Sequence, residues 1–114
     1  MTASDPVAYV TKDLSTVREL LHPSRLPGLG MSLAEAVVEA GAATAEHLHE
    51  DFDEIYYCLE GRGTLFLNGQ ALEFSPHRYY LLPRGGAHYL RAATRLRLLC
   101  ICCPGYTHDK TKLL

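Results

Sequence analysis

The most constraining feature of the sequence is a pair of histidines separated by one residue, in a stretch bounded by Gly41 and Gly61. His47 and His49 occupy positions i and i+2, and Glu54 follows five residues later. Alternate side chains of a β-strand point to the same face, whereas on a helix they would lie about 200° apart. The pair can therefore hold one metal ion only if this segment is extended.

A fourth potential ligand, His88, follows a second turn that contains Pro83 and Gly85. Three neutral imidazoles and one carboxylate leave a bound divalent ion with a net charge of about +1. This set suits one divalent transition metal (Fe, Mn, Ni, Co, Cu or Zn), and the ligand types alone do not select among these metals. Four ligands on an octahedral ion leave open positions, which would allow dioxygen activation or Lewis-acid catalysis.

Length and composition restrict the class of protein. The chain has 114 residues, 47% of them hydrophobic and 21% charged, which is typical of one folded domain. The net charge of −2, without a cluster of Lys or Arg, gives no reason to expect a nucleic-acid partner. No apolar run reaches the length of a membrane span, and the first residues lack the pattern of a signal peptide. We therefore expect a cytoplasmic protein without a membrane partner.

Regular turn signals after Gly61 predict short antiparallel strands, as in a sandwich or barrel. The strongest is Asn68-Gly69, a typical two-residue hairpin turn. Residues 16–21 are ambiguous between a helical turn and a strand. The strands expected from residue 55 onwards are residues 55–59, 64–67, 71–74, 79–82, 88–91 and 95–102.

These residues resemble the cupin family. Its first motif, G(X)5HXH(X)3,4E(X)6G, is matched at every fixed position by the two glycines, the two histidines and the glutamate of the opening stretch. Its second motif, G(X)5PXG(X)2H(X)3N, is matched at Pro83, Gly85 and His88. His77 replaces the leading glycine of that motif and Ala92 replaces its asparagine, and neither position is a metal ligand in the family. The resemblance covers residues 31–103.

The resemblance implies an all-β fold, a double-stranded β-helix or jelly-roll barrel, with the metal inside. It implies an N-terminal arm over 1–30 that packs on the barrel or swaps with a neighbour, a barrel over 31–103 and a C-terminal tail over 104–114, in a single domain. Residues 31–39, and the segment around the two histidines, should then be strands although Ala, Glu and Leu there favour a helix. The flanks also resemble small monocupins of the mannose-6-phosphate-isomerase-like group, which suggests a homodimer.

Several further residues are candidates near the metal. Tyr56 lies two residues after Glu54 and should face the interior, either as a catalytic phenol or as a core aromatic. Arg84 could meet an anionic substrate at the barrel mouth, although loop arginines are usually solvated. The four cysteines are interpreted as reduced and buried rather than disulfide-bonded; they are Cys58, Cys100, Cys102 and Cys103.

Three classes of function follow from this site. The first is a metal-dependent enzyme acting on a small oxygenated molecule, as a dioxygenase or as an isomerase-type Lewis-acid catalyst. The second is a module that binds or senses a small molecule through the metal without turnover. The third is a storage or interaction role. One fold carries many chemistries, so the motifs do not identify the substrate.

Overall fold

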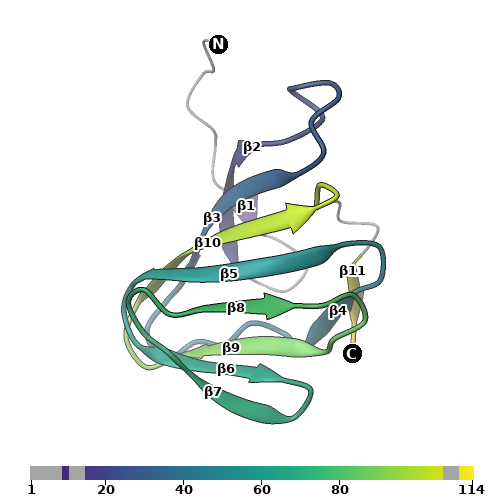
Figure 1. Cartoon of the computed structure of the whole chain (residues 1–114). Helices are drawn as coiled ribbons and strands as arrows, with labels where there is room; N and C mark the ends of the chain where they lie inside the picture. The colour runs from purple at the N-terminus through teal and green to yellow at the C-terminus, as the bar shows by residue number, and fades with distance from the viewer. Residues whose placement is uncertain (1–8, 11–14, 107–110) are drawn as a thin grey trace.

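The structure, a computed structural model, describes residues 9–10, 15–106 and 111–114. Over these residues the chain forms two antiparallel β-sheets that face each other and curve into a barrel (Figure 1). The predicted all-β jelly-roll fold is confirmed. Within the same ranges there is no helix that is long and apolar enough to cross a membrane.

The first sheet has six strands in the order β1-β2-β3-β10-β5-β8, and each neighbouring pair is antiparallel. Its strands are β1 (Tyr9–Val10), β2 (Thr16–Leu21), β3 (Ser32–Val38), β10 (Leu96–Cys103), β5 (Asp53–Glu60) and β8 (Tyr79–Leu82). The second sheet has the order β11-β4-β9-β6-β7. Its strands are β11 (Thr111–Leu113), β4 (His47–His49), β9 (His88–Ala92), β6 (Gly63–Leu67) and β7 (Gln70–Phe74).

Tertiary packing overrides helix propensity in β3 and β4. In β3, Ala36 and Val38 are buried, and the strand lies between β2 and β10. In β4, both histidines are buried while Leu48 between them is half-buried, as the strand interpretation of the pair requires. The ambiguous residues 16–21 form β2, and β11 lies in the expected C-terminal tail over 104–114, where no strand was predicted.

The interior face of the first sheet changes in character along the barrel. At one end, Leu98 of β10 lies beside Ala36 of β3 and Cys58 of β5, and all three are buried. At the other end, Cys102 of β10 lies beside Ser32 of β3 and Glu54 of β5. The apolar core therefore fills one end, and polar groups line the other.

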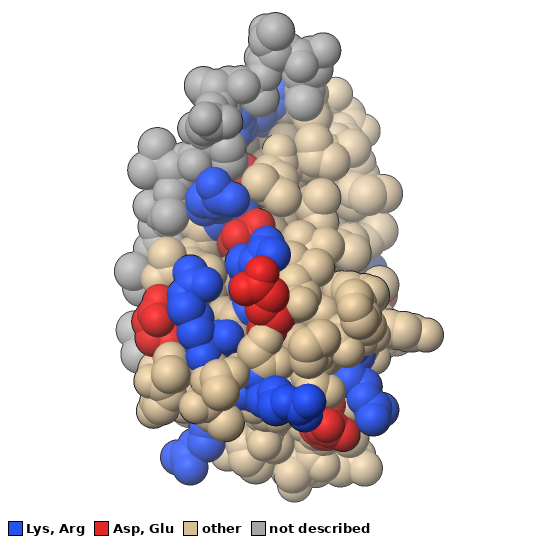
Figure 2. Space-filling view, turned by 90° about the vertical axis from the view of Figure 1, so that its left-hand side faces the viewer, with Lys and Arg blue, Asp and Glu red and all other residues tan. Residues whose placement is uncertain are grey.

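The outer face of the first sheet carries a chain of ion pairs across its strands. Glu35 forms ion pairs with Arg18 at 3.5 Å and with Arg97 at 3.3 Å, and Arg97 also pairs with Glu60 at 2.8 Å. Figure 2 shows acidic and basic side chains interleaved on this flank of the molecule. The arginines of this region are thus balanced by carboxylates on the outside of the barrel.

Two positions of the family motifs, Gly61 and His77, lie in turns where the backbone has a positive φ angle. Gly61 has φ of +91°, and a Cβ there would lie 2.1 Å from the carbonyl oxygen of Arg95, so a side chain does not fit. His77, where the family motif has glycine, has φ of +72°, in the left-handed region. A residue with a Cβ pays a conformational cost there, although histidine adopts this region more readily than most. The departure from the motif is thus accommodated with local strain.

We predict that His77→Gly stabilises the protein by about 0.5–1 kcal/mol, because glycine adopts this conformation without strain. The unfolding midpoint should rise by roughly 2–5 °C in a thermal melt. The matched control is His77→Ala, which also removes the 3.0 Å hydrogen bond between His77 Nδ1 and the Tyr57 hydroxyl but keeps the Cβ. A glycine variant that melts no higher than the alanine variant would contradict this explanation.

Candidate metal centre

The four ligands named from the sequence come together between the two sheets. His47 and His49 project from β4, and His88 lies directly opposite His47 on the neighbouring strand β9. Glu54 approaches from the other sheet, at the start of β5. All four side chains are buried, with at most 5% of each residue exposed. The site is thus built where the two sheets meet.

Hydrogen bonds to the outer nitrogen of each ring fix how the imidazoles are presented. The Nδ1–H of His47 donates to the carbonyl of Ala45 at 2.7 Å, and that of His88 donates to the carbonyl of Gly86 at 2.9 Å. A carbonyl only accepts, so in each neutral ring Nδ1 carries the proton and Nε2 carries a lone pair. Such bonds orient metal-binding histidines in proteins.

The ring nitrogens of the three histidines and one oxygen of Glu54 point towards a common centre between the sheets. One ring nitrogen from each of the three histidines lies within 4.8 Å of the others. Two ligands at about 2.1 Å from the same ion are at most about 4.2 Å apart, so this spacing is close to what one ion needs. Glu54 Oε1 lies 3.2 Å from His49 Nε2 and 3.7 Å from His88 Nε2.

Two of these ligand atoms are buried and make no hydrogen bond within the described part of the chain. Among the described residues, Glu54 Oε1 and His88 Nε2 have no hydrogen-bond partner. With its proton on Nδ1, His88 directs a lone pair towards a carboxylate oxygen, and two buried acceptors facing each other are unfavourable. A shared cation removes this conflict, so the residues present fit a bound metal ion.

The surroundings of Glu54 keep its carboxylate ionised and oriented towards the histidines. Burial raises the pKa of Glu54, but the close approach of the His49 and His88 rings to its carboxylate outweighs burial and lowers the pKa to about 2. The second oxygen, Oε2, accepts from the thiol of Cys102 at 3.3 Å. Burial, followed by the charge of Glu54, raises the pKa of that thiol, which therefore stays protonated and able to donate. Cys102 thus holds Glu54 with Oε1 turned towards the histidines.

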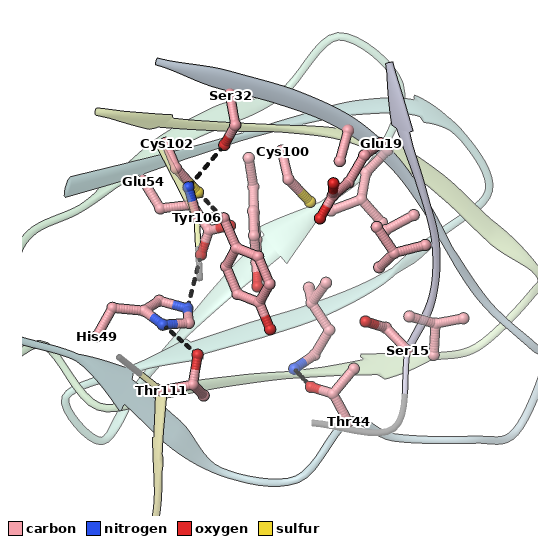
Figure 3. Close-up of a pocket in the computed structure, with 17 residues that line it drawn as sticks. Ser15, Glu19, Ser32, Thr44, His49, Glu54, Cys100, Cys102, Tyr106 and Thr111 are labelled. Carbon is pink, nitrogen blue, oxygen red and sulfur yellow. Dashed lines mark hydrogen bonds and ion pairs between the residues drawn. The ribbon is translucent and has the colours of Figure 1, made fainter. Parts of the chain in front are cut away.

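The C-terminal segment completes the surroundings of His49, as Figure 3 shows. Thr111 pairs with His49 across β11 and β4, and its hydroxyl lies 3.0 Å from His49 Nδ1. Phe52 stacks on the same imidazole with ring centroids 4.4 Å apart, and Tyr106 meets it edge-on at 5.8 Å. Sequence reasoning missed the contacts of Thr111 and Tyr106 because no local motif links residues so far apart in the chain.

A cavity opens beside the centre, between the sheets. It encloses about 600 Å³ of space not filled by atoms, part of which is open to solvent. His49 and Glu54 border it at one end, and its walls are mostly apolar. The remaining lining residues are Ser15, Val17, Glu19, Ser32, Ala34, Ala36, Val38, Thr44, Tyr56, Leu90, Leu98, Cys100, Cys102, Tyr106 and Thr111.

The other candidates from the sequence fall in different places. Tyr56 is buried, lines the cavity and meets His88 edge-on with ring centroids 5.7 Å apart, so it lies close enough to take part in the site. Arg84 lies on the surface and pairs with Asp53 at 3.5 Å. The four cysteines are free thiols, as expected, but Cys103 is exposed, because it follows Cys102 in β10 and points to the other face.

Comparison with known proteins places this geometry in a family. The sequence profile described as "Cupin domain" matches residues 34–102. The chain belongs to the cupin family. The resemblance stated from the motifs is thereby confirmed, while the mannose-6-phosphate-isomerase-like subgroup stays a prediction. Family and histidine cluster together indicate a site for a metal ion.

Individual relatives add detail. An uncharacterized protein of Methanocaldococcus jannaschii is 40% identical over 108 residues, which cover 93% of this chain and 86% of that protein. The L-ectoine synthase of Oceanobacillus iheyensis is 32% identical over 88 residues, covering 72% of this chain and 68% of that enzyme. The crystal structure of ectoine synthase from P. lautus superimposes with a TM-score of 0.75 at 27% identity, covering 96% of this chain and 80% of that chain.

We predict that each chain binds one divalent metal ion through His47, His49, Glu54 and His88. Elemental analysis after reconstitution and desalting should give close to one ion per chain. The His47→Ala/His49→Ala double variant should retain little metal, whereas His77→Ala, at an exposed turn, should load like the parent. A double variant that loads fully would contradict the assignment.

Acid should release the metal over a defined range. Imidazoles bind metal only when neutral, and their ordinary pKa is about 6.5. The Glu54 carboxyl, with its pKa lowered to about 2, stays ionised throughout this range. Metal retained after equilibration should therefore fall steeply from about pH 6.5 to 5. A metal content that acid does not change over the whole range in which the protein stays folded would contradict histidine ligation.

Proposed function

We propose that this cupin is a metal-dependent enzyme that acts on a small molecule bound in the cavity between its sheets. The observation that carries the proposal is the pair of buried acceptors, Glu54 Oε1 and His88 Nε2, that face each other beside this cavity. A purely structural zinc site is usually closed by four protein ligands. Here the ligand cluster borders open space, so a bound molecule has access to the ion.

In this proposal the metal ligands, the apolar cavity walls and Tyr56 would have different roles. When bound, the divalent ion would supply Lewis-acid chemistry or, if it is iron, redox chemistry. The apolar walls, including Val38, Leu90 and Leu98, lower the local dielectric and so strengthen polar interactions within the cavity. Tyr56 borders the cavity beside His88, where its hydroxyl could donate a proton to the bound molecule or position it.

The relatives favour an enzyme over a module that only binds. L-ectoine synthases are enzymes by name, and the similarity to them includes most of this chain. Their name also favours a small organic substrate. A non-catalytic binding module is the alternative, because a buried metal next to a cavity can also hold a ligand without converting it.

Turnover decides between these two functions. An enzyme accelerates its reaction in both directions, so L-ectoine itself is a suitable probe of synthase chemistry. We expect the metal-loaded protein to convert L-ectoine, or a member of a panel of diketones, flavonols, thiols, sugar phosphates and uronates, in a nuclear magnetic resonance assay. Oxygen uptake by the iron-loaded protein would identify a dioxygenase, and turnover without oxygen uptake would identify Lewis-acid chemistry.

The control for this assay is the His47→Ala/His49→Ala double variant, which should be inactive with every compound. A second variant, Tyr56→Phe, keeps the ring that packs against His88 but removes the hydroxyl. If the phenol is catalytic, this variant should lose about 100-fold or more in kcat. Compounds that bind the loaded protein but are never converted would favour the binding module.

We also propose that the chain forms a homodimer. Among the described residues, β1 pairs with Thr16 and Val17 at the start of β2, and this edge of the sheet is where a second chain could add a strand. Light scattering coupled to size-exclusion chromatography should give about twice the chain mass of 12.6 kDa. A mass of one chain at micromolar concentration would exclude a stable dimer.

A further inference from the structure

The outer face of the first sheet carries a broad apolar surface. Strands β10, β5 and β8 lie side by side in this sheet, as Figure 1 shows. Their side chains alternate between the barrel interior and the outside, as the burial patterns of the strands show. The six outward positions in the middle of these strands form what we call the outer apolar patch: Ile55, Tyr57, Tyr79, Leu81, Leu99 and Ile101.

The strand register arranges the outer apolar patch in two rows that cross the three strands. The first row is Leu81, Ile55 and Ile101, and the second is Tyr79, Tyr57 and Leu99. The rings of Tyr57 and Tyr79 stack with their centroids 6.2 Å apart. Leu33 of β3 pairs with Ile101 and extends the first row onto a fourth strand. The patch is therefore continuous across the sheet.

Much of this patch is open to solvent. Tyr79 is 69% exposed, Leu81 is 59% exposed and Ile55 is 37% exposed. Where one face of an antiparallel sheet meets water, its outward positions are usually polar, whereas strands that are apolar on both faces are typical of sheets covered on both sides. β8 and the second half of β10 are apolar on both faces. This part of the sheet thus has the composition of a sheet that is covered from outside.

The charges at two margins of the patch are balanced. At one margin lies the chain of ion pairs described above, in which two arginines offset two glutamates. At the other margin, Asp53 is the outward residue of β5 next to Ile55, and it pairs with Arg84 at 3.5 Å. Margins of a single sign would favour an oppositely charged partner or an anionic membrane. Balanced margins around an apolar centre instead fit an identical copy of the same surface, which they do not repel.

The face is also large enough for a dimer interface. From β3 to β8 it spans three inter-strand spacings, about 14 Å, and from residue 97 to residue 103 it extends about 20 Å along β10. With the side chains at the margins included, this is roughly 600 Å² in plan, comparable to the ~800 Å² that each partner buries in a standard interface. Such interfaces have an apolar centre and a polar rim, as this face does.

We propose that the outer apolar patch is the surface through which two copies of this chain pack face to face. Under twofold symmetry each patch meets an identical patch, so the apolar rows cover each other. The two sheets would then lie about 10 Å apart, as packed sheets do. This inference rests on the homodimer proposed above and names its surface. A strand added at the β2 edge is compatible with it, because the edge and the outer face of a sheet are different surfaces.

The test is the oligomeric state of the full-length protein and its variants, measured by sedimentation equilibrium from micromolar to submillimolar concentration. In Leu81→Glu a carboxylate would be buried without a partner between two apolar faces, so the dimer dissociation constant should rise by about 100-fold or more. Tyr79→Lys places the opposite charge on the same patch and should weaken the dimer in the same way. An effect that does not depend on the sign of the charge indicates burial of the patch.

Two controls isolate the role of the patch. Ala71→Glu adds the same charge at an exposed position of β7, in the other sheet, and should leave the dissociation constant unchanged. Leu81→Met keeps the apolar character of the patch and should retain the dimer. Because Leu81 and Tyr79 are both more than half exposed, their variants should fold, and a melting midpoint and metal content like those of the parent would verify this.

The outcomes separate this inference from the proposals on which it builds. A parent protein that is dimeric and stays equally dimeric in folded Leu81→Glu and Tyr79→Lys overturns the role of the patch and leaves the homodimer standing. Equal weakening by Ala71→Glu overturns it as well, because the effect would then come from net charge. A parent that is monomeric at every concentration contradicts the homodimer and this inference together, and leaves the metal-dependent function untouched.

Discussion

The approach of Glu54 to the histidines of the opposite sheet is the contact on which the site depends. A carboxylate from β5 and imidazoles from β4 and β9 meet in a buried place where direct pairing satisfies only part of their hydrogen-bonding capacity. The cost of burying these groups is recovered only if something cationic joins them. Backbone carbonyls behind the rings and a thiol behind the carboxylate hold this arrangement, so the site is organised by the fold before any ion binds.

Local sequence patterns were sufficient for much of the fold. The spacing of His47 and His49 required a strand where propensity favours a helix, and β4 is a strand with both rings buried. Asn68-Gly69 joins β6 and β7 in the predicted hairpin, because both residues adopt the positive φ that this turn requires. The histidine spacing and the Asn-Gly turn are short-range patterns. They could be recognised from the sequence because each one restricts the backbone conformation of a few neighbouring residues.

The rest of the site depends on contacts between distant segments, which no local pattern encodes. Thr111 orients His49 from 62 residues away, and Cys102 holds Glu54 from 48 residues away. Glu19 faces the cavity only because residues 16–21 form a strand, a choice that the sequence left open. The resemblance to ectoine synthases likewise did not emerge from the motifs, which the whole family shares.

The change in character along the barrel interior has a consequence for how such a protein can evolve. The packed end, with Leu96 and Leu98, supplies the hydrophobic burial that folding requires, while the end with Cys102 and Glu54 supplies reactive groups. Because stability and chemistry are concentrated at opposite ends of the same strands, substitutions at the reactive end leave most of the core intact. A barrel of this kind can exchange one reaction for another over generations while its scaffold persists, in keeping with the many activities found on single folds.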